Sequence, residues 1–173
     1  MVTSSKRPLA VFDIDGTIFR NSLLIELHWK MVRRGLIPRA AIAKLDKLYW
    51  AWVRREGTYD EYLAEVVENF LLSIKKQPVR DIQSAAKRVV EVQSDITYRY
   101  TRDLVRKLSK THILVAISGS PTLVAEAFAK KWGFDYVLAT EYEVIDKQFT
   151  GKTITVPFLD KGKALREFVA NRN

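Results

Sequence analysis

The amino-acid sequence predicts an α/β fold, a doubly wound parallel sheet with an all-helical module inserted into it. Two short apolar runs, residues 9–12 and 112–117, are typical of strands that are buried on both faces. Between them, residues 20–96 carry apolar side chains at helical spacing. From residue 97 onward helical and strand-like segments alternate, as they do when helices cover a parallel sheet.

The inserted module should hold four helices. The first covers residues 22–34, and Pro38 can open the second. Thr58 and Glu61 have the spacing of a capping box, in which each side chain bonds the backbone N–H of the other residue, so a third helix should start there. Pro78 can start the fourth helix, because proline is tolerated in a first helical turn.

Helices and strands alternate in the second half of the chain. Three helices are expected there, over residues 98–109, 121–132 and 161–169. Strands are expected over residues 112–117, 136–140 and 142–145. A turn at residues 146–147 and an extended segment at 149–151 indicate a hairpin.

Composition restricts the class of protein. Hydrophobic residues make up 47% of the 173 residues and charged residues 28%, which is ordinary for a globular domain. The chain has no cysteine and only two histidines, which excludes disulfides, thiolate metal sites and a histidine-rich zinc site. No apolar run approaches the roughly 18 residues that span a bilayer, so we expect a cytoplasmic protein without a membrane span.

The net charge is +9, from 29 basic and 20 acidic residues. A solvated basic surface explains this excess, and so would a surface for nucleic acid or an anionic membrane on the aromatic and basic module. We favour the first explanation and do not expect a nucleic-acid partner. The sequence leaves the oligomeric state open.

Two carboxylates stand at the end of the first predicted strand, in the run Asp13-Ile14-Asp15-Gly16-Thr17. Alternation along an extended chain places Asp13 and Asp15 on the same side, and Gly16 allows a sharp turn. Open parallel sheets bind ligands at this edge. Such a pair can bind a divalent metal or divide nucleophilic and acid–base roles, although a turn rich in Asp and Gly also occurs without any site.

Two further segments carry groups that suit an anion. Ser118-Gly119-Ser120 follows the second predicted strand and opens a helix, where hydroxyl and backbone N–H groups can bind phosphate. Alternatively, Ser120 is an ordinary N-cap before Pro121. Lys161 lies at the start of the last predicted helix, where a cation is unfavourable unless an anion is near. A solvated lysine is the alternative interpretation.

Together these segments resemble the haloacid dehalogenase superfamily of phosphohydrolases, in particular its phosphoserine-phosphatase-like members (subfamily IB). The D-x-D-x-T motif of that superfamily matches residues 13–17, its Ser/Thr motif matches residues 118–120 and its lysine motif matches Lys161, in KGKALREFVA. The segment DKQFTG, residues 146–151, is similar to a hairpin of these members. The resemblance implies a discontinuous Rossmann-like core, residues 1–19 and 97–173, and a helical cap, residues 20–96.

The resemblance also implies a Mg²⁺-dependent phosphomonoester hydrolase that acts on a small phosphorylated metabolite. Asp13 would attack phosphorus and form an aspartyl-phosphate, and Asp15 would be the general acid and base. Mg²⁺ would bind the Asp13 carboxylate and the Asp15 carbonyl. Ser118, Gly119 and Lys161 would stabilise the transferring phosphoryl group. Further candidates for binding phosphate or substrate are Thr17, Ser120, Arg20 and Asn21.

Two features depart from the superfamily pattern. No acidic pair corresponding to a fourth motif follows the last predicted helix, so the alternative function is a catalytically weak or inactive phosphate-binding protein. We expect such a chain to bind Mg²⁺ weakly unless another acid, Asp135, Glu141 or Asp160, replaces the missing ligands. Ser22 stands where phosphoserine phosphatases carry a substrate-reading glutamate, which disfavours phosphoserine as the substrate.

Overall fold

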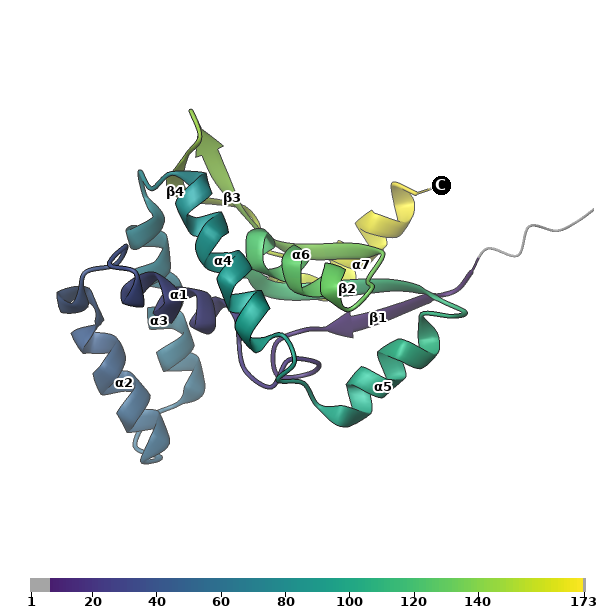
Figure 1. Cartoon of the computed structure of the whole chain (residues 1–173), viewed down its shortest axis with the longest axis horizontal. Helices are drawn as coiled ribbons and strands as arrows, with labels where there is room; N and C mark the ends of the chain where they lie inside the picture. Colours follow the sequence, from purple (N-terminus) through teal and green to yellow (C-terminus); the bar gives the residue numbers. More distant parts are fainter. Residues whose placement is uncertain (1–6, 173) are drawn as a thin grey trace, which may run out of the picture.

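The computed structural model describes residues 7–172 as a four-stranded sheet with helices packed against it (Figure 1). The strands are β1 (Leu9–Asp13), β2 (Ile113–Pro121), β3 (Tyr136–Ile145) and β4 (Gln148–Thr155), and they lie in this order across the sheet. β1, β2 and β3 are parallel, whereas β4 pairs antiparallel with β3. The α/β fold predicted from the sequence is confirmed, and its parallel part comprises the first three strands.

The third strand is longer than the sequence indicates. Residues 136–140 and 142–145 are predicted as separate strands, and this is wrong, because both belong to β3. No break is needed between them, since β4 pairs with β3 from Glu141 to Ile145 and shifts of register absorb the irregularity. The hairpin turn is present at Asp146 and Lys147, whose φ angles of 50° and 63° lie in the left-handed region.

The inserted helices are α1 (Leu23–Arg33), α2 (Ala43–Val53), α3 (Tyr59–Ile74) and α4 (Val79–Gln93). The capping box of α3 is confirmed: Thr58 Oγ1 accepts from the Glu61 N–H at 3.2 Å, and Glu61 Oε2 accepts from the Thr58 N–H at 2.8 Å. The helix expected after Pro38 differs in its first turn, which is a 3₁₀ helix (Arg39–Ile42) ahead of α2. No side chain caps that start, and the Ala41 N–H bonds the Pro38 carbonyl in a tighter turn instead.

The helices of the second half are α5 (Arg99–Leu108), α6 (Thr122–Lys131) and α7 (Lys161–Ala170), the last preceded by a 3₁₀ helix (Pro157–Asp160). α6 packs against β2 and β3 and also contacts α1 and α4. Its Phe128 contacts Phe19 with ring centroids 5.6 Å apart, and both rings are fully buried. One apolar cluster therefore runs from the sheet into the inserted helices, and the division into core and cap stays a prediction.

Within residues 7–172, no helix combines the length and the apolar character that crossing a bilayer requires.

Candidate active site

The carboxyl edge of the parallel strands brings together segments that are far apart in the sequence. Asp13 ends β1 and pairs across the sheet with Ile117 of β2. Lys161, the first residue of α7, places its Nζ 3.0 Å from Asp13 Oδ1. Thr17 Oγ1 donates a hydrogen bond to Asp13 Oδ2 at 3.3 Å. The side chains of Asp13 and Lys161 are 31% and 35% exposed, so the ion pair is accessible to a ligand.

A tight loop after β1 holds the two carboxylates. The Ile14 side chain is fully buried, and the Ile14 carbonyl accepts hydrogen bonds from the N–H groups of residues 17–19. Gly16 takes a φ of +73°, which residues with a Cβ rarely adopt, and its N–H lies within hydrogen-bond distance of the carbonyls of Phe19 and Asn21. The loop therefore fixes the backbone at both aspartates.

The Asp15 carboxyl group is directed into the protein. Oδ2 accepts a hydrogen bond from Ser118 Oγ at 2.6 Å, and Oδ1 accepts from the Leu23 N–H at 2.6 Å. Ser120 Oγ lies 3.0 Å from both oxygens. Burial raises the pKa of Asp15 above its ordinary value; the hydrogen bonds oppose this rise and the charge of Asp13 adds to it. A carboxyl group with a raised pKa is suited to hold a proton.

The two predicted serines contact the Asp15 carboxyl group. Both are buried, and the Ser118 hydroxyl bonds Asp15, while contact of Ser118 with a ligand stays a prediction. Ser120 is not the N-cap of α6 either: Pro121 occupies that position without a side-chain hydrogen bond. Ser120 Oγ instead accepts from the Leu24 N–H at 2.9 Å. The serines thus connect β2 with Asp15 and with the start of α1.

Gly119 faces an aromatic residue that the sequence did not single out. A Cβ at Gly119 would lie 3.2 Å from the Cβ and Cγ atoms of Phe158, so a larger residue would displace that side chain. The Phe158 ring centroid lies 5.1 Å from Lys161 Nζ. Phe158 therefore contacts both the second and the third motif and helps to position Lys161 beside Asp13. A local sequence pattern could not predict the contact of Phe158 with Gly119, because these residues are far apart in the sequence.

The two lysines of α7 have different surroundings. Lys161 reaches Asp13, whereas Lys163 is exposed and its Nζ lies 3.9 Å from Glu167 Oε1 on the same helix. Asp160 caps this helix, because its Oδ1 accepts from the Lys163 N–H at 2.8 Å. The cap fixes the first turn of α7, and with it the position of Lys161.

Arg20 and Asn21, the two candidates that follow the first motif, have different surroundings. Arg20 is exposed, and its guanidinium lies 5.6 Å from the centroid of the Tyr98 ring. This contact places the guanidinium against Tyr98, and substrate binding by Arg20 stays a prediction. Asn21 lines a pocket, and its Nδ2 donates to Glu26 Oε1 at 2.6 Å.

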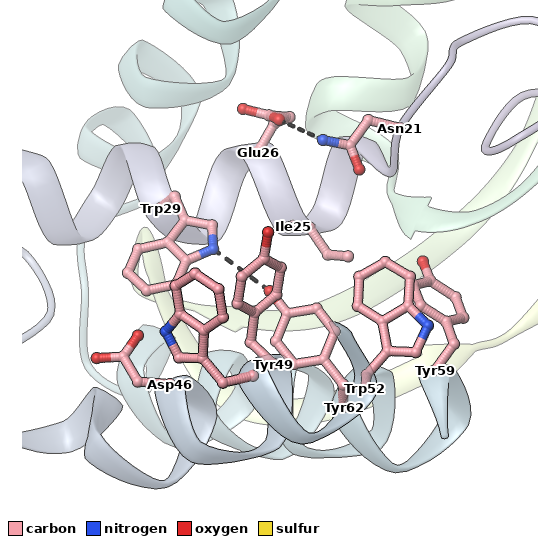
Figure 2. A pocket seen from close by; sticks show the side chains of 10 residues that line it. Asn21, Ile25, Glu26, Trp29, Asp46, Tyr49, Trp52, Tyr59 and Tyr62 are labelled. Atoms are coloured by element: carbon pink, nitrogen blue, oxygen red, sulfur yellow. Dashed lines mark hydrogen bonds between the residues drawn. The ribbon is translucent and has the colours of Figure 1, made fainter. Parts of the chain in front are cut away.

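That pocket has a volume of about 460 Å³ and lies between α1, α2 and α3 (Figure 2). Its walls are mostly aromatic, and it is lined by Asn21, Ile25, Glu26, Trp29, Asp46, Tyr49, Trp50, Trp52, Tyr59 and Tyr62. Burial raises the pKa of Tyr59, and the charge of Asp15 adds to this rise. The pocket lies beside the loop that follows Asp15, because the backbone carbonyl of Asn21 accepts a hydrogen bond from the Gly16 N–H. The sequence did not reveal this pocket, because aromatic residues in a helical module fill a core equally well.

The site offers few ligands for a metal. Among residues 7–172, no cluster of three or more Asp, Glu, His or Cys side chains could hold a metal ion. The expected substitutes do not complete the set. Asp135 Oδ2 accepts from the Leu114 N–H at 2.8 Å, Asp160 caps α7, and Glu141 is exposed on β3. The Asp13 carboxylate and the Asp15 carbonyl stay predictions as metal ligands.

Comparisons with known proteins place the chain in a family and a fold. The model of the haloacid dehalogenase-like hydrolase family matches residues 10–173. No curated protein matches the chain. Among solved structures, a protein of unknown function from Bordetella pertussis Tohama I has a TM-score of 0.73 and 19% identity, with 98% of this chain and 77% of that chain covered. A substrate-bound phosphoserine phosphatase has a TM-score of 0.59 and 18% identity, with coverage of 98% and 73%.

A phosphoserine phosphatase from T. onnurineus, in complex with NDSB-201, has a TM-score of 0.55 and 23% identity, with 97% of this chain and 73% of that chain covered. These similarities concern the fold. The family model covers nearly the whole chain. The chain therefore belongs to the haloacid dehalogenase-like hydrolase family and has the fold of its phosphoserine-phosphatase-like members.

Proposed function

We propose that the chain is a Mg²⁺-dependent phosphomonoester hydrolase that acts through an aspartyl-phosphate on a small phosphorylated metabolite. Membership of the hydrolase family supports the reaction class. The observation that carries the proposal is the accessible ion pair of Asp13 and Lys161, 3.0 Å apart at the carboxyl edge of the parallel strands. Phosphoryl transfer to an aspartate requires a carboxylate nucleophile beside a cation that stabilises phosphoryl oxygens.

The reaction has two steps. In the first, an Asp13 oxygen attacks phosphorus, the bond to the leaving oxygen breaks, and Asp15 donates its proton to that oxygen. In the second, Asp15 accepts a proton from the water that attacks the aspartyl-phosphate, which releases phosphate and restores Asp13. The raised pKa of Asp15 supports this role, because the carboxyl group must carry a proton when the leaving oxygen departs.

Other residues hold these groups in place. Ser118 and Ser120 are positioning residues, since their hydroxyls contact the Asp15 carboxyl. Thr17 orients the Asp13 carboxylate. Lys161 and the N–H of Gly119 would stabilise the charge of the transferring phosphoryl group.

The available donors fit Mg²⁺, a hard cation that is commonly held by one or two carboxylates together with substrate phosphate and water. The Asp13 carboxylate and the Asp15 carbonyl would hold it, and when bound it supplies positive charge that reduces repulsion between Asp13 and the phosphoryl oxygens. Because residues 7–172 contain no metal-binding cluster of three acids, a phosphate-binding protein with weak catalysis is the second candidate function.

Phosphoserine is not the substrate that we propose, despite the shared fold. Ser22 is buried, and its hydroxyl accepts from the Ile25 N–H at 3.5 Å as the N-cap of α1. This side chain therefore serves the helix and is not available to bind a substrate.

Hydrolysis of p-nitrophenyl phosphate, with Mg²⁺ or with a chelator, tests the proposal. Asp13→Asn keeps the shape of the side chain and removes the attacking charge, so kcat should fall by about a thousandfold. Asp103→Asn, at an exposed position of α5, is the matched control and should keep full activity. Retention of a tenth of kcat by Asp13→Asn would contradict the assignment. Phosphate binding by the unmodified chain without turnover would favour the second candidate.

A further inference from the structure

The aromatic pocket, the pocket of about 460 Å³ between α1, α2 and α3, is lined by several partly exposed aromatic side chains. Tyr49, Trp50, Trp52 and Tyr59 are 36%, 53%, 37% and 37% exposed. Apolar surface gathered in one place is unfavourable in water and marks a binding site. The volume suits a small organic group.

The charged residues that line the aromatic pocket indicate which charge a bound ligand should carry. Glu26 and Asp46 line it, and none of its lining residues in the described part of the chain is Lys, Arg or His. This absence contrasts with the net charge of +9 of the whole chain. Two bases of the neighbouring helices are paired elsewhere: Lys44 with Glu65, and Arg54 with Glu56. A pocket with two carboxylates and no base favours a cation.

The side chains of the aromatic pocket are already held in position. The rings of Trp52, Tyr59 and Tyr62 contact one another: the Trp52 centroid lies 5.2 Å from that of Tyr59 and 6.1 Å from that of Tyr62, and the two tyrosine centroids are 6.4 Å apart. Trp29 Nε1 donates to the Tyr62 hydroxyl at 3.4 Å, which connects α1 with α3, as Figure 2 shows. The Glu26 carboxylate accepts hydrogen bonds from the side-chain amides of Asn21 and Gln93. Rings fixed in this way attract ammonium groups through their faces.

We propose that the aromatic pocket binds an alkylated ammonium group on the leaving alcohol of the phosphomonoester. The substrate class is therefore a phosphate ester whose alcohol carries a quaternary or tertiary ammonium group. The pocket lies beside the loop that carries Asp15, the proposed acid for the leaving oxygen, because the backbone carbonyl of its lining residue Asn21 accepts a hydrogen bond from the Gly16 N–H. The role of the pocket in substrate recognition rests on the proposed phosphatase function, whereas binding of the ammonium group does not require turnover.

Tryptophan fluorescence of the full chain measures this binding without any phosphate ester. The probe is choline chloride, and the control is 3,3-dimethylbutan-1-ol, its uncharged carbon analogue, at constant ionic strength. We expect a saturable change with choline and binding of the neutral analogue that is weaker by about fivefold or more. Asp46→Asn and Glu26→Gln should each weaken choline binding by about threefold, while Glu91→Gln, at an exposed position of α4, should not change it.

The inference is overturned if the folded chain gives no saturable signal with choline, or if the neutral analogue binds as tightly. A second measurement compares kcat/KM for phosphocholine and for 3,3-dimethylbutyl phosphate. Hydrolysis of both esters without a preference for phosphocholine overturns the inference and leaves the phosphatase function standing. Choline binding without hydrolysis of any ester supports the pocket assignment and contradicts the phosphatase function.

Discussion

Asp13 and Asp15 are neighbours on one strand end, yet their carboxyl groups have different surroundings. Asp13 is half-exposed and ion-paired with Lys161. Asp15 is held by two buried serines and a backbone N–H, and burial raises its pKa. Two titratable groups whose environments differ in this way are suited to different roles. The ion-paired carboxylate is suited to attack phosphorus, and the buried one to carry a proton.

The two lysines of α7 allow a matched comparison. Lys161→Ala removes the cation beside Asp13 and should weaken orthovanadate binding by about tenfold, as expected for a lost charged contact. Lys163→Ala removes an exposed lysine on the same helix and should change binding by less than about twofold. Calorimetric titration of both variants checks this. Equal losses in the two variants would mean that Lys161 does not contact the anion.

The raised pKa of Asp15 predicts a pH dependence of stability. The folded chain keeps a proton on Asp15 at pH values where the unfolded chain, with a pKa of 3.8, has lost it. As pH rises from the unfolded value through the folded one, the unfolded state is favoured and the free energy of unfolding falls. Above the folded pKa, this unfavourable contribution of Asp15 is complete.

Asp15→Asn removes this titration. The stability of the variant relative to the unmodified chain should therefore increase from pH 4 to pH 7, as measured by urea unfolding at both values. A difference between the two proteins that stays constant with pH would show that the Asp15 pKa is not raised.

At the scale of elements, the N-cap residues of three helices help to position groups of the candidate active site. Asp160 caps the helix that carries Lys161, and Ser22 caps the helix whose first N–H groups bond Asp15 and Ser120. The start of α3 is fixed by the capping box, and Tyr59 of the aromatic pocket is its first residue. A change in a cap is therefore expected to affect both stability and the placement of site residues.

The capping box of α3 can be tested by a double-mutant cycle. Thr58→Ala and Glu61→Ala should each lower the free energy of unfolding by about 1 kcal/mol. Because the two side chains bond each other's backbone, the double variant should lose less than the sum of the single losses. Urea unfolding of the four proteins measures these values. Strict additivity would show that the two hydrogen bonds form independently.

At the scale of the whole molecule, the sheet and the inserted helices enclose a site with few acidic ligands. The proposed ligands of Mg²⁺ are the Asp13 carboxylate and the Asp15 carbonyl, and residues 7–172 contain no cluster of three or more Asp, Glu, His or Cys side chains that could hold a metal. This ion keeps several waters and dehydrates reluctantly, so its affinity for the chain should be weak, with a Kd of about a millimolar. Calorimetric titration of Mg²⁺ checks this value. Micromolar affinity together with rapid phosphate ester hydrolysis would mean that a further acidic residue joins the site.

The sequence by itself determined the fold class, the motifs and several element boundaries. Strands and helices follow from hydrophobic periodicity, and the start of α3 follows from Thr58 and Glu61, because these signals act between residues a few positions apart. The position of Asp13 at a strand end is equally local. The pairing of Lys161 with Asp13 agreed with the family resemblance rather than with any local rule.

Only the tertiary structure decided where the side chains point. Ser118 and Ser120 turn to Asp15, Arg20 stacks on Tyr98, and Phe158 meets Gly119, each through contacts between distant segments. The aromatic pocket likewise needs three helices packed at a particular distance. Such contacts depend on how elements pack, and periodicity specifies which face of a helix is apolar but not which residue it meets.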